Sequence, residues 1–369
     1  MRHRNLAVWL IVPWMWAAIG YASETSVASG PESRLWRLAE QEQSALEARG
    51  VVLCDASLSE YLQEVVGRLW NQVPTRLDAP TVKVIKDTRI DAYAYPNGRC
   101  VLSTGMLDVL ENESQLAMIL SHEMVHYARQ HTTALYNHFQ QAARRGDRQG
   151  NGKDAVAVKR SVLHTIEAAE READSEGLSI LGAAGYCEGE VLPLMSNLIK
   201  RMPEHGHPES VGELEDRAAF FRQRIGQGPG RRPAAASSDT DPDGYLAGIA
   251  PALLANTEVA LRRGEWHQAE RSISRFLALN PANAHAYYLK GETMRRQNAG
   301  DSGNHCIGSY QKALTIDPDF SPAHRALGEL HYKAGRYQMA KPHFESFLSL
   351  APRDHAGDYI RGYLRQCSN

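Results

Sequence analysis

Two histidines four residues apart constrain this chain of 369 residues more than any other feature of its sequence. His122 and His126 flank Glu-Met-Val, and apolar residues from 113 to about 133 recur every three or four positions, which predicts an amphipathic helix. On a helix the two imidazoles share one face and can hold one metal ion. Zinc suits imidazole, and a catalytic zinc site takes a third protein ligand while one position stays open for water. A second segment must therefore pack against this helix.

The third ligand is expected from a second helix. A metzincin site would need glycine at position 129 and histidine at position 132, where Arg129 and Thr132 stand. The alternative is a glutamate, as in His₂Glu zinc sites. We expect Glu170 to bind the metal and Asp174, one turn later, to orient a ligand histidine, while Glu172 points elsewhere on the helix. An acidic helix alone is more often a solvated face, so its pairing with the two histidines carries this prediction.

Glu123 occupies a position from which a carboxylate can act on a metal-bound water. It directly follows the first histidine and can take the proton of that water. The predicted reaction is peptide-bond hydrolysis, with one zinc ion per chain. Two alternatives stay open. The chain can be a chaperone or scaffold with a silent zinc site, or the zinc can be structural, with His207 as a candidate fourth ligand.

Further stretches resemble those of a known family. Residues 91–98 read Asp-Ala-Tyr-Ala-Tyr-Pro-Asn-Gly and residues 103–107 read Ser-Thr-Gly-Met-Leu, ahead of His-Glu-x-x-His and of the Glu-x-x-x-Asp that begins at Glu170. Over residues 32–225 this combination resembles the HtpX-like zinc endopeptidases, relatives of the CAAX prenyl proteases. The resemblance implies a gluzincin-type metallopeptidase domain that is mostly α, built around a small β-sheet.

The family pattern includes a His-Pro step after the third ligand, and His207-Pro208 matches it. The resemblance implies that His207 approaches the metal, either to stabilise the oxyanion as a catalytic residue or to occupy the open position, with His205 as a rival. The sequence departs from the pattern shortly afterwards, because the usual arginine is absent. Glu213 stands in that region, and Arg217 comes later.

The N-terminal residues predict export. Arg2, His3 and Arg4 precede an apolar run from 6 to 19, which is too short for a membrane span and is followed by small residues. We expect residues 1–22 to be a signal peptide, and the family resemblance implies that the mature protein is periplasmic. An uncleaved membrane anchor is the alternative, and peripheral membrane contact is compatible with either.

The composition of the chain limits the classes of function and the number of domains. A formal net charge of -2 argues against a nucleic-acid binder, which normally carries a basic stripe. Hydrophobic residues make up 43%, which suffices for packed cores, and the length suits two domains. The five cysteines are an odd number, so at least one thiol stays unpaired, and their spacing assigns no disulfide.

A small sheet is expected ahead of the metal-binding helix. Residues 32–72 are helix-patterned with a break near Gly50, and residues 81–86 alternate like a half-buried strand. Residues 91–95 and 99–103 flank Pro-Asn-Gly, which predicts a hairpin with a type I′ turn, whose two central residues need positive φ. We expect unfolded or misfolded protein substrates to lie along the 91–95 strand and extend the sheet.

Breaks in the pattern suggest the domain boundaries. The charged, glycine-containing segment 137–154 predicts a mobile loop long enough for a lid, followed by a helix from 155 to 181 with Gly185 near its C-terminal cap. Residues 227–244 have the composition of a linker. We therefore expect a metallopeptidase domain over residues 23–226.

Prolines recur at a near-constant spacing in the remaining residues, 245–369. Pro281, Pro318 and Pro352 each follow an apolar helical stretch, with spacings of 37 and 34 residues. Small and aromatic residues between them fall where a 34-residue tetratricopeptide repeat packs its two helices closely. They are Leu327, Gly328, Gly335, Ala340 and Phe344 in the last unit, Gly291, Tyr310 and Ala313 in the middle unit, and Gly264 and Ala269 in the weaker first unit.

This pattern predicts an α-solenoid of three tetratricopeptide repeats and a final helix from 354 to 365, with an ordinary helical bundle as the alternative. Stacked helix pairs offer a surface to a peptide or protein partner. The family resemblance implies that this partner is the outer-membrane assembly machinery or a stalled outer-membrane protein.

Overall fold

The computed structural model describes residues 31–149, 152–202, 211–227, 242–297 and 304–367. Contacts between Cα atoms divide the chain into two compact units, Met1–Ala252 and Leu253–Asn369, and the division falls within helix α10 (Pro242–Arg263). The expected signal peptide, His205, His207 and residues 228–241 of the expected linker lie outside the described residues.

Two helices open the first unit. They are α2 (Pro31–Ala48) and α3 (Ala56–Trp70), and the predicted break between them contains Gly50 at φ +66°. Asp55 caps α3, because its side chain accepts a hydrogen bond from the backbone N–H of Leu58 at 2.9 Å.

A three-stranded sheet follows, in the order β1-β3-β2. Its strands are β1 (Thr81–Ile85), β2 (Ala92–Ala94) and β3 (Arg99–Ser103). Strand β3 pairs in parallel with β1 and antiparallel with β2, which confirms the predicted hairpin. Strand β2 therefore lies at an edge of the sheet.

The predicted type I′ turn of the hairpin is wrong. Gly98 has φ +80°, but Asn97 is not among the described residues with positive φ. The connection runs through Pro96, whose ring fixes a negative φ and excludes the type I′ conformation. Gly98 supplies the single left-handed residue, and its N–H donates to the carbonyl of Tyr95 at 3.1 Å.

Helix α5 (Glu113–Ala128) is central to the first unit. Every side chain from Ser114 to Tyr127 is buried, and the helix contacts α3, α7 and strands β2 and β3. It ends earlier than the predicted residue 133, because Gln130 adopts φ +55° and breaks the helical backbone. The short helix α4 (Thr104–Val109) joins it to the sheet.

The predicted mobile loop at 137–154 is wrong. Helix α6 (His131–Gln149) runs through most of it, and α7 (Gly152–Ala183) begins three residues later. Residues 140–145 are glutamine, alanine and arginine, which are strong helix formers and outweigh the single glycine that follows. The C-terminal end of α7 agrees with the prediction, since Gly185 has φ +89°.

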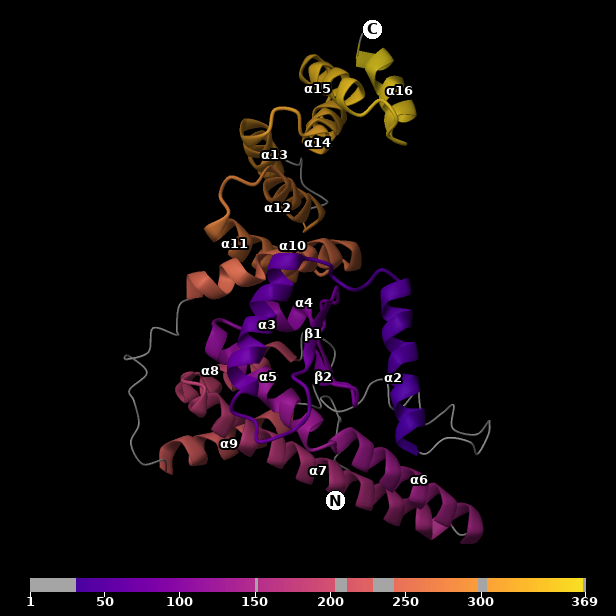
Figure 1. The fold of residues 1–369 in the computed structure, drawn as a ribbon. Coiled ribbons are helices and arrows are strands. Elements are labelled where there is room, and N and C mark those ends of the chain that lie inside the picture. Colours follow the sequence, from indigo (N-terminus) through magenta and orange to yellow (C-terminus); the bar gives the residue numbers. More distant parts are fainter. Residues whose placement is uncertain (1–30, 150–151, 203–210, 228–241, 298–303, 368–369) are drawn as a thin grey trace. The chain divides into compact units, whose positions relative to one another are not determined.

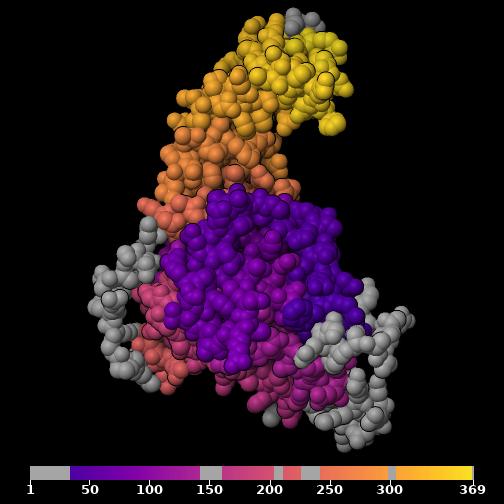
Figure 2. Space-filling view, in the orientation of Figure 1, coloured from indigo at the N-terminus to yellow at the C-terminus, as the bar shows by residue number. Residues whose placement is uncertain are grey.

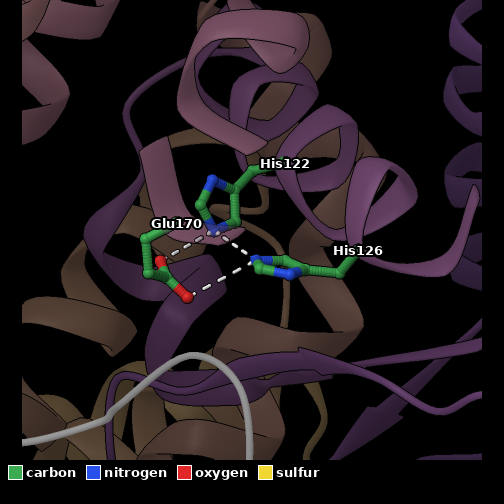
Figure 3. Close-up of side chains that lie close together, drawn as sticks. All are labelled: His122, His126 and Glu170. Atoms are coloured by element: carbon green, nitrogen blue, oxygen red, sulfur yellow. Dashed lines mark hydrogen bonds and ion pairs between the residues drawn. The ribbon is translucent and has the colours of Figure 1, made fainter. Parts of the chain in front are cut away.

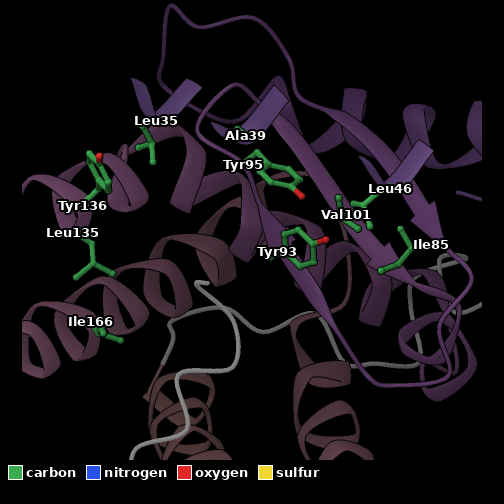
Figure 4. Packing of buried hydrophobic residues seen from close by; sticks show 10 residues of the cluster. All are labelled: Leu35, Ala39, Leu46, Ile85, Tyr93, Tyr95, Val101, Leu135, Tyr136 and Ile166. Carbon is green, nitrogen blue, oxygen red and sulfur yellow. The ribbon is translucent and has the colours of Figure 1, made fainter. Parts of the chain in front are cut away.

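The remaining elements of this unit are a 3₁₀ turn (Glu188–Glu190), α8 (Val191–Arg201) and α9 (Val211–Gln227). One buried cluster joins α2, the sheet, α6 and α7 (Figure 4). It consists of Leu35, Ala39, Leu46, Ile85, Tyr93, Tyr95, Val101, Leu135, Tyr136 and Ile166. In the space-filling view the early part of the chain, coloured indigo and purple, forms much of the near face of this unit (Figure 2).

The second unit is entirely helical in its described residues. After α10 come α11 (Trp266–Leu279), α12 (Ala284–Gln297), α13 (Asn304–Ile316), α14 (Ser321–Lys333), α15 (Tyr337–Leu350) and α16 (Gly357–Cys367). Pro281, Pro318 and Pro352 lie directly beyond α11, α13 and α15, where the sequence places them. The final helix begins and ends slightly later than predicted.

Small residues allow the helices of a pair to approach closely. A Cβ atom on Gly291 would lie 2.5 Å from the ring of Tyr310, and one on Gly328 would lie 2.5 Å from the ring of Phe344. In the first pair, Asn256 of α10 instead donates a hydrogen bond to Ser272 of α11 at 3.0 Å, with both side chains buried. The polar contact replaces the glycine–aromatic contact of the later pairs, which agrees with the weaker match of the pair α10–α11 to the repeat pattern.

The fold class agrees with the prediction. The chain has a mostly helical first unit around a small sheet, followed by a helical C-terminal region (Figure 1). Among the described helices, none combines the length and apolar character needed to cross a bilayer. None of the five cysteines, all of which the structure describes, forms a disulfide.

Candidate metal centre

Two helices bring the site together. Helix α5 carries His122, Glu123 and His126, and α7 carries Glu170. Their close approach depends on Gly177 of α7, where a Cβ atom would lie 3.2 Å from the backbone nitrogen of His122. The long α7 thus packs against α5 where the ligand residues stand, which confirms the expected packing of two helices.

The two histidines and Glu170 converge in the buried interior (Figure 3). The Nε2 atoms of His122 and His126 are 3.0 Å apart. Oxygens of Glu170 lie 3.3 Å from His122 Nε2 and 3.5 Å from His126 Nε2. In the described part of the chain, this is the only group of three such side chains with one ligand atom each within 4.8 Å.

These distances fit a zinc ion. Zinc bonds of roughly 2.0–2.2 Å in a tetrahedron place the ligand atoms about 3.3 Å from one another. The Glu170 oxygens lack hydrogen-bond partners among the described residues although they are buried, an arrangement that a cation would stabilise. Burial alone would lower the pKa of His122, but its contacts with Asp174 and Glu170 raise it to about 9.

Asp174 contacts the ring nitrogen of His122 that faces away from Glu170. Its Oδ1 lies 3.0 Å from His122 Nδ1, which leaves Nε2 directed at Glu170. Arg217 of α9 donates to Asp174 through Nε at 2.8 Å and Nη2 at 2.5 Å, and its Nη2 lies 3.4 Å from His122 Nδ1. Burial alone would raise the pKa of Asp174, but the Arg217 guanidinium and His122 hold it well below its ordinary value.

The second histidine has a matching contact chain. His126 Nδ1 lies 3.0 Å from His131 Nδ1, and His131 Nε2 lies 3.2 Å from Glu172 Oε2. Glu172 is not one of the three clustered side chains, as expected, and it reaches the site only indirectly, through His131. Burial lowers the pKa of His131 and favours its neutral form, which can donate from one nitrogen and accept at the other.

Comparison with known families decides the class of this domain. Residues 56–223 match the model of Peptidase family M48. They form an M48 peptidase domain. The match spans α3, the sheet, both ligand helices and Arg217, and a peptidase domain of this family implies a metalloprotease.

Curated relatives match shorter stretches. The chain is 28% identical over 158 residues to a putative beta-barrel assembly-enhancing protease of Vibrio cholerae, covering 37% of this chain and 31% of that protein. It is 20% identical over 158 residues to the beta-barrel assembly-enhancing protease of Yersinia pestis, covering 38% and 32%. A mouse protein O-mannosyl-transferase, TMTC1, is 30% identical over 89 residues, covering 23% and 9%. The chain thus spans a third or less of the length of these relatives.

Within the M48 domain, Glu123 is a buried carboxyl group next to the ligands. It is 1% exposed, and neither of its oxygens has a hydrogen-bond partner among the described residues. Burial raises its pKa to about 8, with contributions from the carboxylates of Glu170 and Asp91. A carboxyl group with such a pKa can exchange a proton near neutral pH.

Asp91, directly before β2, is predicted from the sequence only as part of the substrate-binding strand. It is 9% exposed, and its Oδ1 has no hydrogen-bond partner in the described chain. Burial raises its pKa to about 7. The site therefore contains a second buried acid within electrostatic range of Glu123.

Arg217, which the sequence places after the departure from the family pattern, contacts the site. It lies four residues, about one helical turn, beyond Glu213 on α9 and donates a hydrogen bond to Asp174. Glu213 is half-buried, and burial together with Glu170 raises its pKa to about 7. His207 and its rival His205 lie outside the described residues, so their predicted approach to the metal stays a prediction.

Proposed function

We propose that this protein is a zinc-dependent endopeptidase of the cell envelope that cleaves extended or misfolded protein segments. The observation that carries the proposal is the meeting of His122, His126 and Glu170 within 4.8 Å of one another, beside the buried carboxyl group of Glu123. A structural site offers no reason for an acid without a hydrogen-bond partner at this position.

Each side chain has a distinct role in the proposed reaction. Zinc, when bound, acts as a Lewis acid toward the scissile carbonyl and the attacking water. His122, His126 and Glu170 hold the ion, and Asp174 fixes the orientation of His122. Glu123 takes the proton of the attacking water and passes it to the leaving amine. His207 is proposed as a further catalytic residue that stabilises the oxyanion.

The substrate is proposed to lie along β2. This strand is at an edge of the sheet and contacts α5, and no described strand pairs with its outer side. Main-chain hydrogen bonds to such an edge depend little on substrate side chains. This mode favours extended segments of unfolded or misfolded proteins over a single sequence motif.

The cellular role is proposed to be quality control of outer-membrane proteins in the periplasm. The names of the Vibrio and Yersinia relatives, both beta-barrel assembly-enhancing proteases, support this role. The basic and apolar residues at the N-terminus support export. The C-terminal helix pairs are proposed to be tetratricopeptide repeats that recruit partners, including the outer-membrane assembly machinery.

The test combines metal analysis with a casein cleavage assay on the mature protein. We expect one zinc ion per chain and chelator-sensitive cleavage. The variant Glu123→Gln should keep the metal and the fold but lose cleavage by at least about a hundredfold, the scale of general acid–base catalysis. Retained cleavage by this variant would remove Glu123 from the mechanism.

Chelation also separates the two alternatives. Loss of cleavage with the fold retained supports the enzyme, whereas unfolding on loss of zinc supports a structural metal. A protein that never cleaves casein but still binds unfolded chains would be a chaperone or scaffold. Circular dichroism during chelation measures the fold independently of activity.

A further inference from the structure

Three histidines lie together within the C-terminal unit. His324 and His331 belong to α14, about two helical turns apart, so they share one face of this helix. His343 belongs to α15, which packs against α14 (Figure 1). The ring centroid of His343 is 5.3 Å from that of His324 and 6.0 Å from that of His331. Two packed helices thus gather imidazoles, which are ligands that suit zinc and other transition metals.

Two of these rings face each other through nitrogen atoms. Nδ1 of His324 lies 3.0 Å from Nδ1 of His343, the same separation as that between the Nε2 atoms of His122 and His126 in the metal centre. Zinc–nitrogen bonds of roughly 2.0–2.1 Å in a tetrahedron place two ligand nitrogens about 3.3 Å apart. A small outward movement of either ring therefore accommodates an ion between the two nitrogens.

The backbone fixes the tautomer of His324. Its Nε2 lies 2.9 Å from the carbonyl oxygen of Pro318, and this oxygen can only accept, so Nε2 carries the hydrogen. The lone pair of a neutral His324 is then on Nδ1, which faces His343. A backbone carbonyl on the other ring nitrogen is the support that metal-binding histidines typically have.

His343 can supply the second lone pair. Without an ion its Nδ1 donates the hydrogen bond to His324, and with an ion this hydrogen moves to Nε2. Both side chains are half-buried, so an ion can enter from solvent and water can carry the hydrogen between the two nitrogens of His343. The pair of rings is neutral before and after this exchange, and no proton has to be released.

His331 is a third imidazole beside the pair. It is 2% exposed, and its Nδ1 has no hydrogen-bond partner among the described residues. Burial lowers its pKa, as burial and the two neighbouring histidines lower the pKa of His343 to about 4. Both rings are therefore neutral near pH 7, the form that binds metal. The three histidines do not form a group with one ligand atom each within 4.8 Å, so the protein supplies two ligands here.

We propose that a zinc ion binds between His324 and His343 and links α14 to α15, with water in its remaining positions. Its two protein ligands come from different helices, so binding stabilises the folded helix pair. The buried Nδ1 of His331 then has a hydrogen-bond partner in a water on the ion. Two protein ligands hold zinc more weakly than three, so this ion adds to the one that the metal centre of the peptidase unit is expected to retain.

Titration of the full chain with zinc tests the site. Isothermal titration calorimetry measures the stoichiometry and affinity for the wild type and for His324→Gln with His343→Gln. We expect the wild type to bind one zinc ion more than this double variant. The difference is one ion whether or not the peptidase unit binds zinc, so the result is independent of peptidase activity.

Further variants locate the ion. His324→Gln alone should weaken binding of the additional ion at least tenfold, since even an outer contact of a metal ligand typically contributes this much. The control His267→Gln with His355→Gln removes two exposed histidines of the same unit and should bind zinc as the wild type does.

Unfolding of the C-terminal unit provides a measurement that needs no variant. Zinc should raise its urea midpoint in the wild type, whereas the same concentration of calcium, which prefers oxygen ligands, should not. The proposal is overturned if the wild type binds no more zinc than the double variant, or if the control loses the ion as the double variant does. A urea midpoint that zinc leaves unchanged overturns it as well.

Discussion

His131 contacts the metal site only through another histidine. Its Nδ1 faces His126 Nδ1 at 3.0 Å, and Glu172 faces its other nitrogen at 3.2 Å. Outer contacts of this kind typically contribute ten- to a hundredfold to metal affinity. We expect His131→Ala to weaken zinc binding by about this factor, measured by competition with a chromophoric chelator.

A histidine elsewhere on the same helix provides the control. His138 of α6 lies 3.0 Å from the hydroxyl of Ser161, and it is not among the side chains of the metal site. His138→Ala should therefore bind zinc as the wild type does. Equal affinities for the two alanine variants would show that His131 does not support His126.

The ligands could be predicted from the sequence, but their supporting residues could not. His122 and His126 share a helix face by spacing alone, and the Glu-x-x-x-Asp pattern points to Glu170. Arg217 lies 43 residues after Asp174 without a local motif, so it looks like any surface arginine of a helix. His131 was missed because its contact depends on the left-handed Gln130, which turns the chain back toward the site.

At the scale of elements, Gly328 sets the distance between α14 and α15. A Cβ atom there would lie 2.5 Å from the ring of Phe344, so an added methyl group overpacks the pair. We expect Gly328→Ala to destabilise the C-terminal unit by roughly 1–3 kcal/mol, measured by urea unfolding. Gly308 of α13 has no neighbour within 4 Å of such an atom, so Gly308→Ala should stabilise by up to about 1 kcal/mol. A neutral effect at Gly328 would contradict the close packing.

The same helix pair should respond to acid. The Nδ1 atoms of His343 of α15 and His324 of α14 are 3.0 Å apart, and the His343 ring stacks on that of His331. Burial, and then the two neighbouring histidines, lower the pKa of His343 to about 4. Between the ordinary value near 6.5 and about 4, the unfolded chain binds more protons than the folded one, so stability falls as the pH falls.

This dependence can be measured as a slope. The urea midpoint of the C-terminal unit should decrease between pH 7 and pH 5, a range in which most carboxylates stay ionised. The variant His343→Gln should reduce the slope, whatever its effect at pH 7. An unchanged slope would place the acid sensitivity in other groups.

The spacing of residues in the sequence predicts helices and their packing well where the contacting residues are close together in the sequence. Gly328 and Phe344 are 16 positions apart within one helix pair, and the repeat pattern predicted their packing. The error at 137–154 came from reading charge and glycine as a loop, although the intervening residues favour a helix. The turn at Asn97 was misassigned because the preceding Pro96 restricts the backbone more than the Asn-Gly pair suggests.

At the scale of the whole molecule, the division within α10 determines where the chain can be cut. Residues 242–252 belong to the first unit, in which the Tyr245 hydroxyl donates to the carbonyl of Leu107 at 2.8 Å. Tyr245 is 1% exposed. A truncation that starts at residue 245, the boundary suggested by composition, therefore removes a buried aromatic side chain from the peptidase unit.

Two truncations test both the boundary and the recruiting role. Deletion of 265–369 keeps α10 whole and should retain casein cleavage within about twofold, since the ligands and Glu123 lie in the first unit, while partner co-purification is lost. Deletion of 245–369 should also lower the thermal midpoint of the peptidase unit, because losing a large buried aromatic side chain costs roughly 3–5 kcal/mol. Calorimetry measures the thermal midpoint, and affinity capture measures partner binding.

Equal thermal midpoints of the two shortened chains would move the boundary back to residue 245. Partner capture by the shortened chains would assign recruitment to the peptidase unit, because these chains lack the helix pairs.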